Sequence, residues 1–208
     1  MMLFRPGGTE LTKKAAESVR LHGSVLDVGC GLGTSLDFLA EEYGIDPHGI
    51  DASEKTVQKA GKGFITCADA RRLPFEAQSL DAVMFECVLS LIDAPEKAID
   101  EACRVLRPGG AVIISTLTCE GERLSDRGRM NLEKLAALMT EKGFEIKLMS
   151  DETPLLRSFA ANVIFEYGSL TAYAEAAREE LGSCALDCAV PVKGTGYGLL
   201  TAIKEDKA

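Results

Sequence analysis

Short apolar runs alternate with amphipathic stretches along most of this chain. An apolar run over residues 25–28 ends in a glycine-rich turn, and a helical pattern follows from Ser35 to about Tyr43. The same succession of strand and helix repeats as far as about residue 117. Such alternation predicts parallel strands joined by helices, which is an α/β architecture with helices on both faces of a sheet.

The remaining elements follow from the same patterns. Apolar runs predict five strands before residue 117, which we place at 25–28, 47–51, within 64–75, at 80–85 and within 102–115. An amphipathic helix is expected over residues 9–22, and another over 131–142 that ends at Lys142-Gly143. Later in the chain, a strand over 144–149, a mainly helical stretch over 154–181 and a final strand over 194–204 complete the prediction.

Carboxylates follow the predicted strands at a spacing that suits a nucleoside. Asp51 ends the second strand and comes 24 residues after Asp27. Nucleotide-binding folds place a ribose-binding carboxylate about 20 residues beyond the glycine turn. A carboxylate accepts hydrogen bonds from both ribose hydroxyls, so Asp51 is the predicted ribose contact. Ser53 then suits the N-cap of the next helix.

The glycine spacing separates this turn from a dinucleotide site. The glycines are at 29, 31 and 33, which gives acid-x-G-x-G-x-G in place of G-x-G-x-x-G. This pattern resembles motif I of the class I S-adenosylmethionine (SAM)-dependent methyltransferases. Residues 67–75 resemble the same family's x-G-D-A-x-x-L-P-F segment, with Ala68 where glycine is usual. The Leu-Arg-Pro-Gly-Gly of residues 106–110 resembles its helix-turn-strand signature, which we interpret as a glycine-capped helix before a buried strand.

The resemblance implies a fold and a division of the chain. The expected fold is a Rossmann-like α/β sheet of seven strands in the order 3-2-1-4-5-7-6, with an antiparallel last strand. We expect a single domain over residues 1–208, with an N-terminal lid helix at 5–22 and a helical insertion at about 150–191. This insertion would cap the acceptor pocket with apolar side chains, which are Phe159, Ile164, Phe165, Tyr167, Leu170 and Tyr173.

The same resemblance implies SAM as the methyl donor and S-adenosylhomocysteine as the product. In that family the acid of motif I lies near the methionine amino end, the acid of the third segment accepts from the adenine amino group, and the next backbone N–H reaches a ring nitrogen. The predicted cofactor contacts are Gly8, Thr9, Asp27, Gly29, Cys30, Gly31, Gly33, Asp51, Ala52, Asp69, Ala70 and Glu86.

Catalysis by such a protein is mainly a matter of positioning, because the sulfonium already activates the methyl group. A general base is needed only if the acceptor must lose a proton. The catalytic residue therefore stays open, with Glu86 and Cys87, just behind the fourth strand, as the candidates. The pattern is nearest to the ubiquinone- and menaquinone-biosynthesis methyltransferases (methyltransferase type 11), so the expected acceptor is a small molecule.

Two other functions are compatible with these residues. Residues 87–91 also resemble arsenite methyltransferases, which use a cysteine here to hold trivalent arsenic, and soft thiolates suit such an acceptor. Cys119, Cys184 and Cys188 have no assigned role, and no metal site is predicted. The second alternative is a SAM-binding protein without transfer activity. A nicotinamide-dependent oxidoreductase is disfavoured by the glycine spacing.

Composition narrows the class of protein. The 208 residues are 46% hydrophobic and 26% charged, as in an ordinary soluble domain. The net charge of −9 argues against a nucleic-acid partner. No apolar run approaches the roughly 18 residues of a membrane span, and no signal-peptide core begins the chain. We expect a cytoplasmic monomer or homodimer, whose seven cysteines are reduced thiols.

Overall fold

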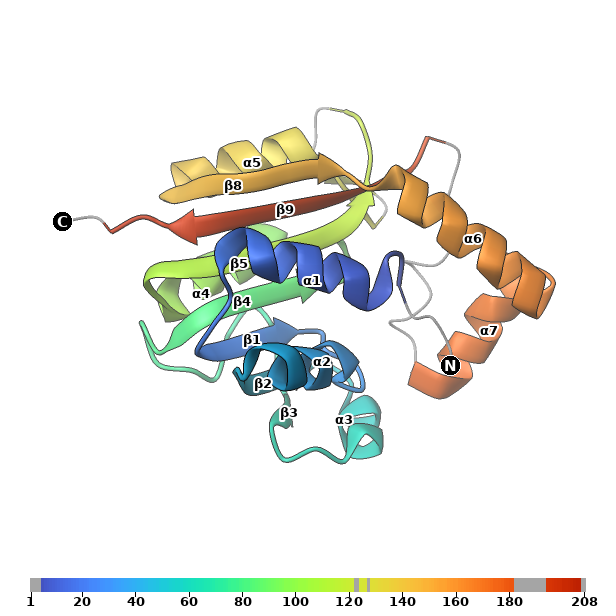
Figure 1. The fold of residues 1–208 in the computed structure, drawn as a ribbon, viewed down its shortest axis with the longest axis horizontal. Coiled ribbons are helices and arrows are strands. Elements are labelled where there is room, and N and C mark those ends of the chain that lie inside the picture. The colour runs from blue at the N-terminus through green and yellow to red at the C-terminus, as the bar shows by residue number, and fades with distance from the viewer. Residues whose placement is uncertain (1–4, 122–123, 127, 182–193, 207–208) are drawn as a thin grey trace.

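A computed structural model describes residues 5–121, 124–126, 128–181 and 194–206. Within these ranges one mixed sheet runs through the molecule, with helices packed on both of its faces (Figure 1). The predicted Rossmann-like α/β architecture is confirmed. Among the described residues, none of the helices combines the length and the apolar character that crossing a membrane requires.

Five parallel strands form one half of the sheet, in the order β3-β2-β1-β4-β5. They are β1 (Ser24–Val28), β2 (Asp46–Asp51), β3 (Ile65–Cys67), β4 (Leu80–Glu86) and β5 (Leu106–Thr118). The other half is antiparallel: β9 (Gly196–Lys204) pairs with β5, and β8 (Phe144–Asp151) pairs with β9. Numbered along the chain, these seven strands have the predicted order 3-2-1-4-5-7-6.

Two short strands were not predicted. β6 (Ser125–Asp126) and β7 (Arg129–Met130) form a hairpin that continues the sheet from the end of β5, where Thr118 pairs with Met130. Each has only two residues, which is too short for an alternating pattern to be recognised in the sequence.

Helices connect the strands as the pattern predicts. They are α1 (Gly8–Val19), α2 (Thr34–Tyr43), α3 (Glu54–Ala60), the 3₁₀ turn η1 (Leu89–Leu91), α4 (Pro95–Val105), α5 (Leu132–Glu141), α6 (Thr153–Tyr167) and α7 (Leu170–Leu181). The first helix ends at Val19, earlier than predicted, because Arg20 adopts a left-handed conformation with φ 52°. Leu21 is nonetheless buried against the sheet.

The hydrophobic core has one layer on each face of the sheet. Side chains alternate along β1, so Leu26 and Val28 pack in one layer and Val25 in the other. Helices α4 and α5 cover the first layer, and α1 and α2 cover the second (Figure 1). Because the five strands are parallel, their carboxyl ends lie together along one edge of the sheet.

The Leu-Arg-Pro-Gly-Gly segment has a role that differs from the predicted helix cap. Helix α4 already ends at Val105, and Leu106 is extended and pairs with Leu80 of β4. The next pair is Ala82 with Ala111, so residues 107–110 form a bulge. A Cβ on Gly110 would lie 2.9 Å from the carbonyl oxygen of Arg107. Gly110 therefore serves a close approach within a bulged strand, and Gly109 adopts a left-handed φ of 77° there.

The described part of the predicted insertion is a helical hairpin beyond the carboxyl ends of the parallel strands (Figure 1). Helices α6 and α7 share a small apolar core of their own, in which Phe159 and Tyr173 are in edge-to-face contact at 5.7 Å. Ile164 and Phe165 are exposed, at 48% and 91%. Residues 182–191, with Cys184 and Cys188, lie outside the described residues.

Candidate cofactor-binding site

The glycine turn joins β1 to α2 through backbone that only glycine adopts easily. Gly29, Gly31 and Gly33 have φ of 73°, 56° and 73°. A Cβ on Gly29 would lie 2.5 Å from Cγ2 of Val88, whereas one on Gly31 would have no atom within 4 Å. Gly31 therefore borders open space, whereas Gly29 is closely packed against Val88.

Asp51 ties the end of β2 to this turn. One carboxylate oxygen, Oδ2, accepts the N–H of Gly31 at 3.1 Å, and the other, Oδ1, accepts the N–H of Ser53 at 2.9 Å. Ser53 caps α3 as predicted, because its hydroxyl accepts the N–H of Thr56 at 3.2 Å. The buried carboxylate thus fixes the turn against the second strand.

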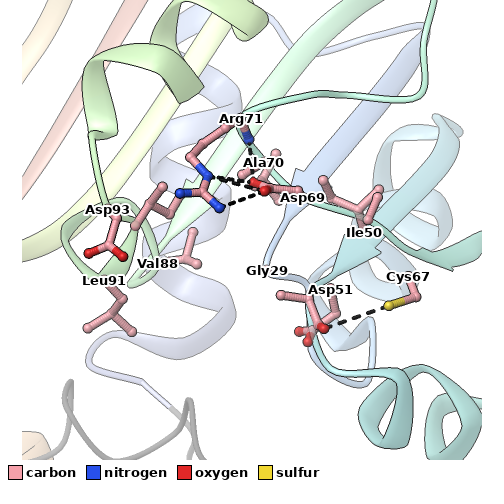
Figure 2. Close-up of a pocket in the computed structure, with 14 residues that line it drawn as sticks. Gly29, Ile50, Asp51, Cys67, Asp69, Ala70, Arg71, Val88, Leu91 and Asp93 are labelled. Carbon is pink, nitrogen blue, oxygen red and sulfur yellow. Dashed lines mark hydrogen bonds and ion pairs between the residues drawn. The ribbon is translucent and has the colours of Figure 1, made fainter.

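A cavity of about 510 Å³ opens beside these groups (Figure 2). Its size lies in the range of small-molecule sites. Five predicted contacts line it, which are Gly29, Asp51, Ala52, Asp69 and Ala70. The facing wall comes from the segment after β4, with Val88, Leu91, Ile92 and Asp93.

Asp69 is held at the outer end of the cavity by an arginine. The Arg71 guanidinium donates to both carboxylate oxygens, with Nη2 at 2.7 Å from Oδ2 and Nε at 3.0 Å from Oδ1 (Figure 2). The backbone N–H of Arg71 donates to Oδ1 at 2.8 Å. These bonds hold the pKa of Asp69 down at about 2. The group is therefore an ionised acceptor at any ordinary pH.

Glu86 is the centre of a buried cluster at the end of β4. Its Oε1 accepts from the hydroxyl of Thr12 at 2.9 Å, and its Oε2 accepts from the hydroxyl of Ser35 at 2.6 Å. Oε2 also forms an ion pair with Nη2 of Arg5 at 3.0 Å. Both oxygens are engaged, so Glu86 joins α1, α2 and the N-terminal arm (residues 5–7) to the sheet.

Arg5 and Asp27 leave two buried polar atoms without partners among the described residues, Arg5 Nη1 and Asp27 Oδ1. Burial raises the pKa of Asp27 well above its ordinary value, the charges of Glu86 and Asp51 add to the rise, and Arg5 opposes it. Arg5 is a residue that sequence patterns did not identify. No periodicity marks it, and only the fold brings residue 5 to residue 86.

Cys87 lies in a strained position beside a buried hydroxyl chain. Its φ is 58°, and its backbone N–H donates to the carbonyl of Ser115 at 2.8 Å. Its Sγ is 3.1 Å from the hydroxyl of Tyr197, which donates to Oγ of Ser115 at 3.2 Å. Burial raises the pKa of Tyr197. Tyr197 is a second residue that the sequence analysis missed.

Within the described ranges, Cys87 is not part of a group of three or more metal-binding side chains. Cys119 lines a separate cleft of about 740 Å³, with Glu120, Asn131 and Asp151. In the part of the chain that the structure describes, no three His, Cys, Asp or Glu side chains gather closely enough to hold a metal ion. A thiol cluster for arsenic is therefore not found in these ranges.

The other predicted contacts lie outside the cavity lining. Gly8 begins α1, where its carbonyl accepts from the hydroxyl of Thr12 at 3.3 Å, and Thr9 is exposed. The sulfur of Cys30 packs against Gly49, where a Cβ would lie 2.7 Å away. Burial raises the pKa of this thiol, so it stays neutral. Gly33 caps the start of α2.

The family profile and two curated relatives that resemble this chain are all methyltransferases. The sequence profile of the methyltransferase domain family matches residues 26–114. A 27-O-demethylrifamycin SV methyltransferase of Amycolatopsis mediterranei is 28% identical over 95% of this chain and 84% of its own length. An arsenite methyltransferase of Halobacterium salinarum is 28% identical over 64% of this chain and 40% of its own length.

Similarity of structure extends over nearly the whole chain. The crystal structure of the [4+2]-cyclase SpnF superposes with a TM-score of 0.71 and 26% identity, covering 95% of this chain and 81% of SpnF. Three curated relatives are longer, and the chain spans only 49%, 40% and 29% of them. The matched profile contains the glycine turn and β1 to β5. In sequence and in fold, the chain is therefore similar to class I SAM-dependent methyltransferases.

Proposed function

We propose that this chain binds SAM and transfers its methyl group to a small-molecule acceptor. One observation carries the proposal. A cavity of about 510 Å³ meets the backbone of Gly29 and the carboxylates of Asp51 and Asp69, at the carboxyl edge of a parallel sheet. Ligands of open α/β sheets bind at this edge. Relatives named as methyltransferases support the type of reaction.

The residues present fit the nucleoside of SAM. Each oxygen of Asp51 accepts one backbone N–H, and a carboxylate offers about four lone-pair sites, so capacity remains for both ribose hydroxyls. Asp69, kept ionised by Arg71, would accept from the adenine amino group, and the N–H of Ala70 would reach a ring nitrogen. The apolar walls at Ile50, Val88 and Leu91 suit the faces of a purine.

The bound cofactor would supply a methyl group that its sulfonium has already activated. The protein then has to hold donor and acceptor in line and exclude water. Glu86 joins the N-terminal arm to the sheet through three donors, which suits a positioning role better than that of a free base. Cys87 stays a candidate for acceptor contact. The α6–α7 hairpin lies beyond the same edge and would cover the acceptor (Figure 1).

The relatives of this chain are named for methyl acceptors of several chemical classes. Their names include an antibiotic O-methyltransferase, a malonyl-acyl-carrier-protein O-methyltransferase and an arsenite methyltransferase. These names support methyl transfer as the reaction and leave open which atom is methylated. A fold of this kind carries several chemistries, since SpnF is a cyclase.

Calorimetric titration of SAM and S-adenosylhomocysteine into two glycine variants tests the cofactor. Gly31→Ala and Gly44→Ala carry similar strain, with φ of 56° and 64°, and neither new Cβ meets an atom within 4 Å. Only Gly31 borders the predicted ligand. Gly31→Ala should weaken SAM binding by about tenfold or more, because overpacking costs about 1–3 kcal/mol. Gly44→Ala should bind normally, and equal affinities would contradict the proposal.

Release of S-adenosylhomocysteine tests the transfer itself. The wild type is incubated with SAM and a panel of phenols, quinols, amines, carboxylates and arsenite with thiol. Turnover with one of these acceptors would support the proposal and identify the acceptor class. Tight SAM binding without turnover on any acceptor would favour a SAM-binding protein without transfer activity.

A further inference from the structure

Arg71 lines the cavity and uses only part of its guanidinium. Its Nε and Nη2 donate to the carboxylate of Asp69, whereas Nη1 has no acceptor in the part of the chain that the structure describes. The side chain is 43% exposed, so it can turn without disturbing the core. Arg71 is therefore a cation with donors left over for a second partner.

The same bonds leave Asp69 little capacity for a ligand. Oδ1 accepts the backbone N–H of Arg71 at 2.8 Å and its Nε at 3.0 Å. Oδ2 accepts Nη2 at 2.7 Å and shares the Nε hydrogen at 3.1 Å. A carboxylate offers about four lone-pair sites, and these four contacts occupy them. A donor group of a ligand can therefore bond Oδ2 fully only if the guanidinium moves away.

A second carboxylate, that of Asp93, lines the same cavity from the opposite wall (Figure 2). Arg71 follows β3 and Asp93 follows β4, and β2 and β1 lie between these two strands in the sheet. The hydrogen bond with Asp69 is the main cause of a raised pKa of Arg71, and the charge of Asp93 adds to the rise. Asp93 is exposed and offers Arg71 an alternative partner across the cavity.

The segment that carries Asp93 is firmly anchored. Leu89, within it, is fully buried in the core. Cys87 and Ala94 flank it, and both have a φ of 58°, a conformation that persists only where the surrounding packing imposes it. A change at this cavity is therefore expected in the exposed side chain of Arg71 and not in the wall that faces it.

We propose that Arg71 is a latch: its guanidinium turns from Asp69 to Asp93 when the nucleoside of SAM binds, and the new ion pair crosses the outer end of the cavity. This inference rests on the proposed function and adds to it the residues that open and close the site. Adenine supplies the differential interaction that such a change requires, because its amino group replaces Nη2 on Asp69 Oδ2. The bound ligand also displaces water from the cavity, which strengthens the pair of Arg71 and Asp93.

A crystal structure of the wild type with bound S-adenosylhomocysteine tests the latch directly. One guanidinium nitrogen of Arg71 should lie about 2.7–2.9 Å from a carboxylate oxygen of Asp93. Oδ2 of Asp69 should face the adenine amino group in place of Nη2. A guanidinium that still bonds both oxygens of Asp69 in this complex would overturn the inference and leave the proposed function standing.

Dissociation rates of S-adenosylhomocysteine, measured by surface plasmon resonance, give a second test. Asp93→Asn should raise the rate about two- to threefold, because an exposed ion pair contributes little and its loss affects mainly dissociation. In an Arg71→Ala background, Asp93→Asn should have no further effect, since the latch is already lost. An equal effect in both backgrounds would mean that Asp93 acts without Arg71, and would overturn the inference.

Glu96→Gln is the matched control, because Glu96 is an exposed carboxylate of α4 that does not line the cavity. It removes the same charge and should release S-adenosylhomocysteine at the wild-type rate. A wild-type rate in Asp93→Asn, or the same increase in both variants, would overturn the latch alone. A wild type that binds neither SAM nor S-adenosylhomocysteine would overturn the proposed function and the latch together.

Discussion

Two arginine–carboxylate pairs in the candidate site have the same chemistry and opposite surroundings. Arg5 and Glu86 are 3.0 Å apart, with side chains 13% and 6% exposed. Arg71 and Asp69 are 2.7 Å apart, with side chains 43% and 50% exposed. The first pair joins three segments of the interior, and the second lies at the outer end of the cavity.

The two pairs differ little in distance and strongly in burial, so burial decides how much each ion pair contributes to stability. Water competes with an exposed pair, so the pair of Arg71 and Asp69 contributes little to stability, whatever its geometry. A buried pair has lost its water, and removing one partner leaves an uncompensated charge. We therefore expect the inner pair to control folding of the arm, and the outer pair to tune ligand binding.

The largest effect is expected from breaking the inner pair. Glu86→Ala should lower the free energy of unfolding by about 3–5 kcal/mol, because Arg5 is left buried without its counter-ion. Urea unfolding measures the change. Asp69→Ala, which removes the outer carboxylate, is the matched control and should leave the midpoint nearly unchanged. Similar midpoints for the two variants would show that burial does not separate the pairs.

Asp51, at the end of β2, should give the next largest effect. Asp51→Ala should weaken SAM binding by about 1–3 kcal/mol, because it removes charge-assisted bonds to the ribose and frees the N–H of Gly31. Asp46→Ala removes an exposed carboxylate from the opposite end of β2 and should bind SAM normally. Unchanged affinity of Asp51→Ala would contradict the ribose contact.

The raised pKa of Asp27 predicts the sign of a pH dependence. Burial favours the protonated form in the free protein, whereas a bound ammonium and sulfonium favour the ionised form. Binding therefore releases protons, and SAM affinity should rise with pH until Asp27 is ionised in the free protein, by less than about tenfold per pH unit. Calorimetry in buffers of different ionisation enthalpy would detect the released proton.

Asp27→Asn supplies the control for that titration. It should bind more weakly and lose the proton release. The raised pKa of Asp27 also affects folding. The folded state binds this proton more tightly than the unfolded state does. The contribution of Asp27 to the free energy of unfolding is therefore lost as the pH rises from about 3.8 toward the pKa of the folded state. Proton release that persists in Asp27→Asn would assign the effect to another group.

The smallest effect is expected from the outer pair. Arg71→Ala should weaken S-adenosylhomocysteine binding by only about two- to threefold at pH 7, because the pair is exposed. The loss should grow at lower pH, since without Arg71 the pKa of Asp69 returns from about 2 toward its ordinary value. Arg72→Ala removes the adjacent arginine, which does not line the cavity, and should match the wild type at both pH values.

Local patterns were enough for the parts of the site that depend on neighbours in sequence. The glycine turn, the strand-end acids Asp51 and Asp69, and the cap at Ser53 were all predicted from short segments, and the structure brings Gly29, Asp51 and Asp69 to one cavity. The Leu-Arg-Pro-Gly-Gly segment was misread, because glycines in a helix cap and in a strand bulge look alike in sequence.

By itself, the sequence determined the alternation of strands and helices and the acids at the strand ends, since periodicity, turns and strand-end acids are properties of short segments. Its resemblance to the methyltransferases added the strand order, which the structure confirms. Only the tertiary structure decided which distant residues meet at the strand ends. Arg5 reaches Glu86 across 81 positions of sequence, and Tyr197 reaches Cys87 across 110. Burial in the packed molecule raises the pKa of Asp27, and exposure to solvent weakens the ion pair of Arg71 and Asp69. Burial is a property of the packed molecule and has no local signal in the chain.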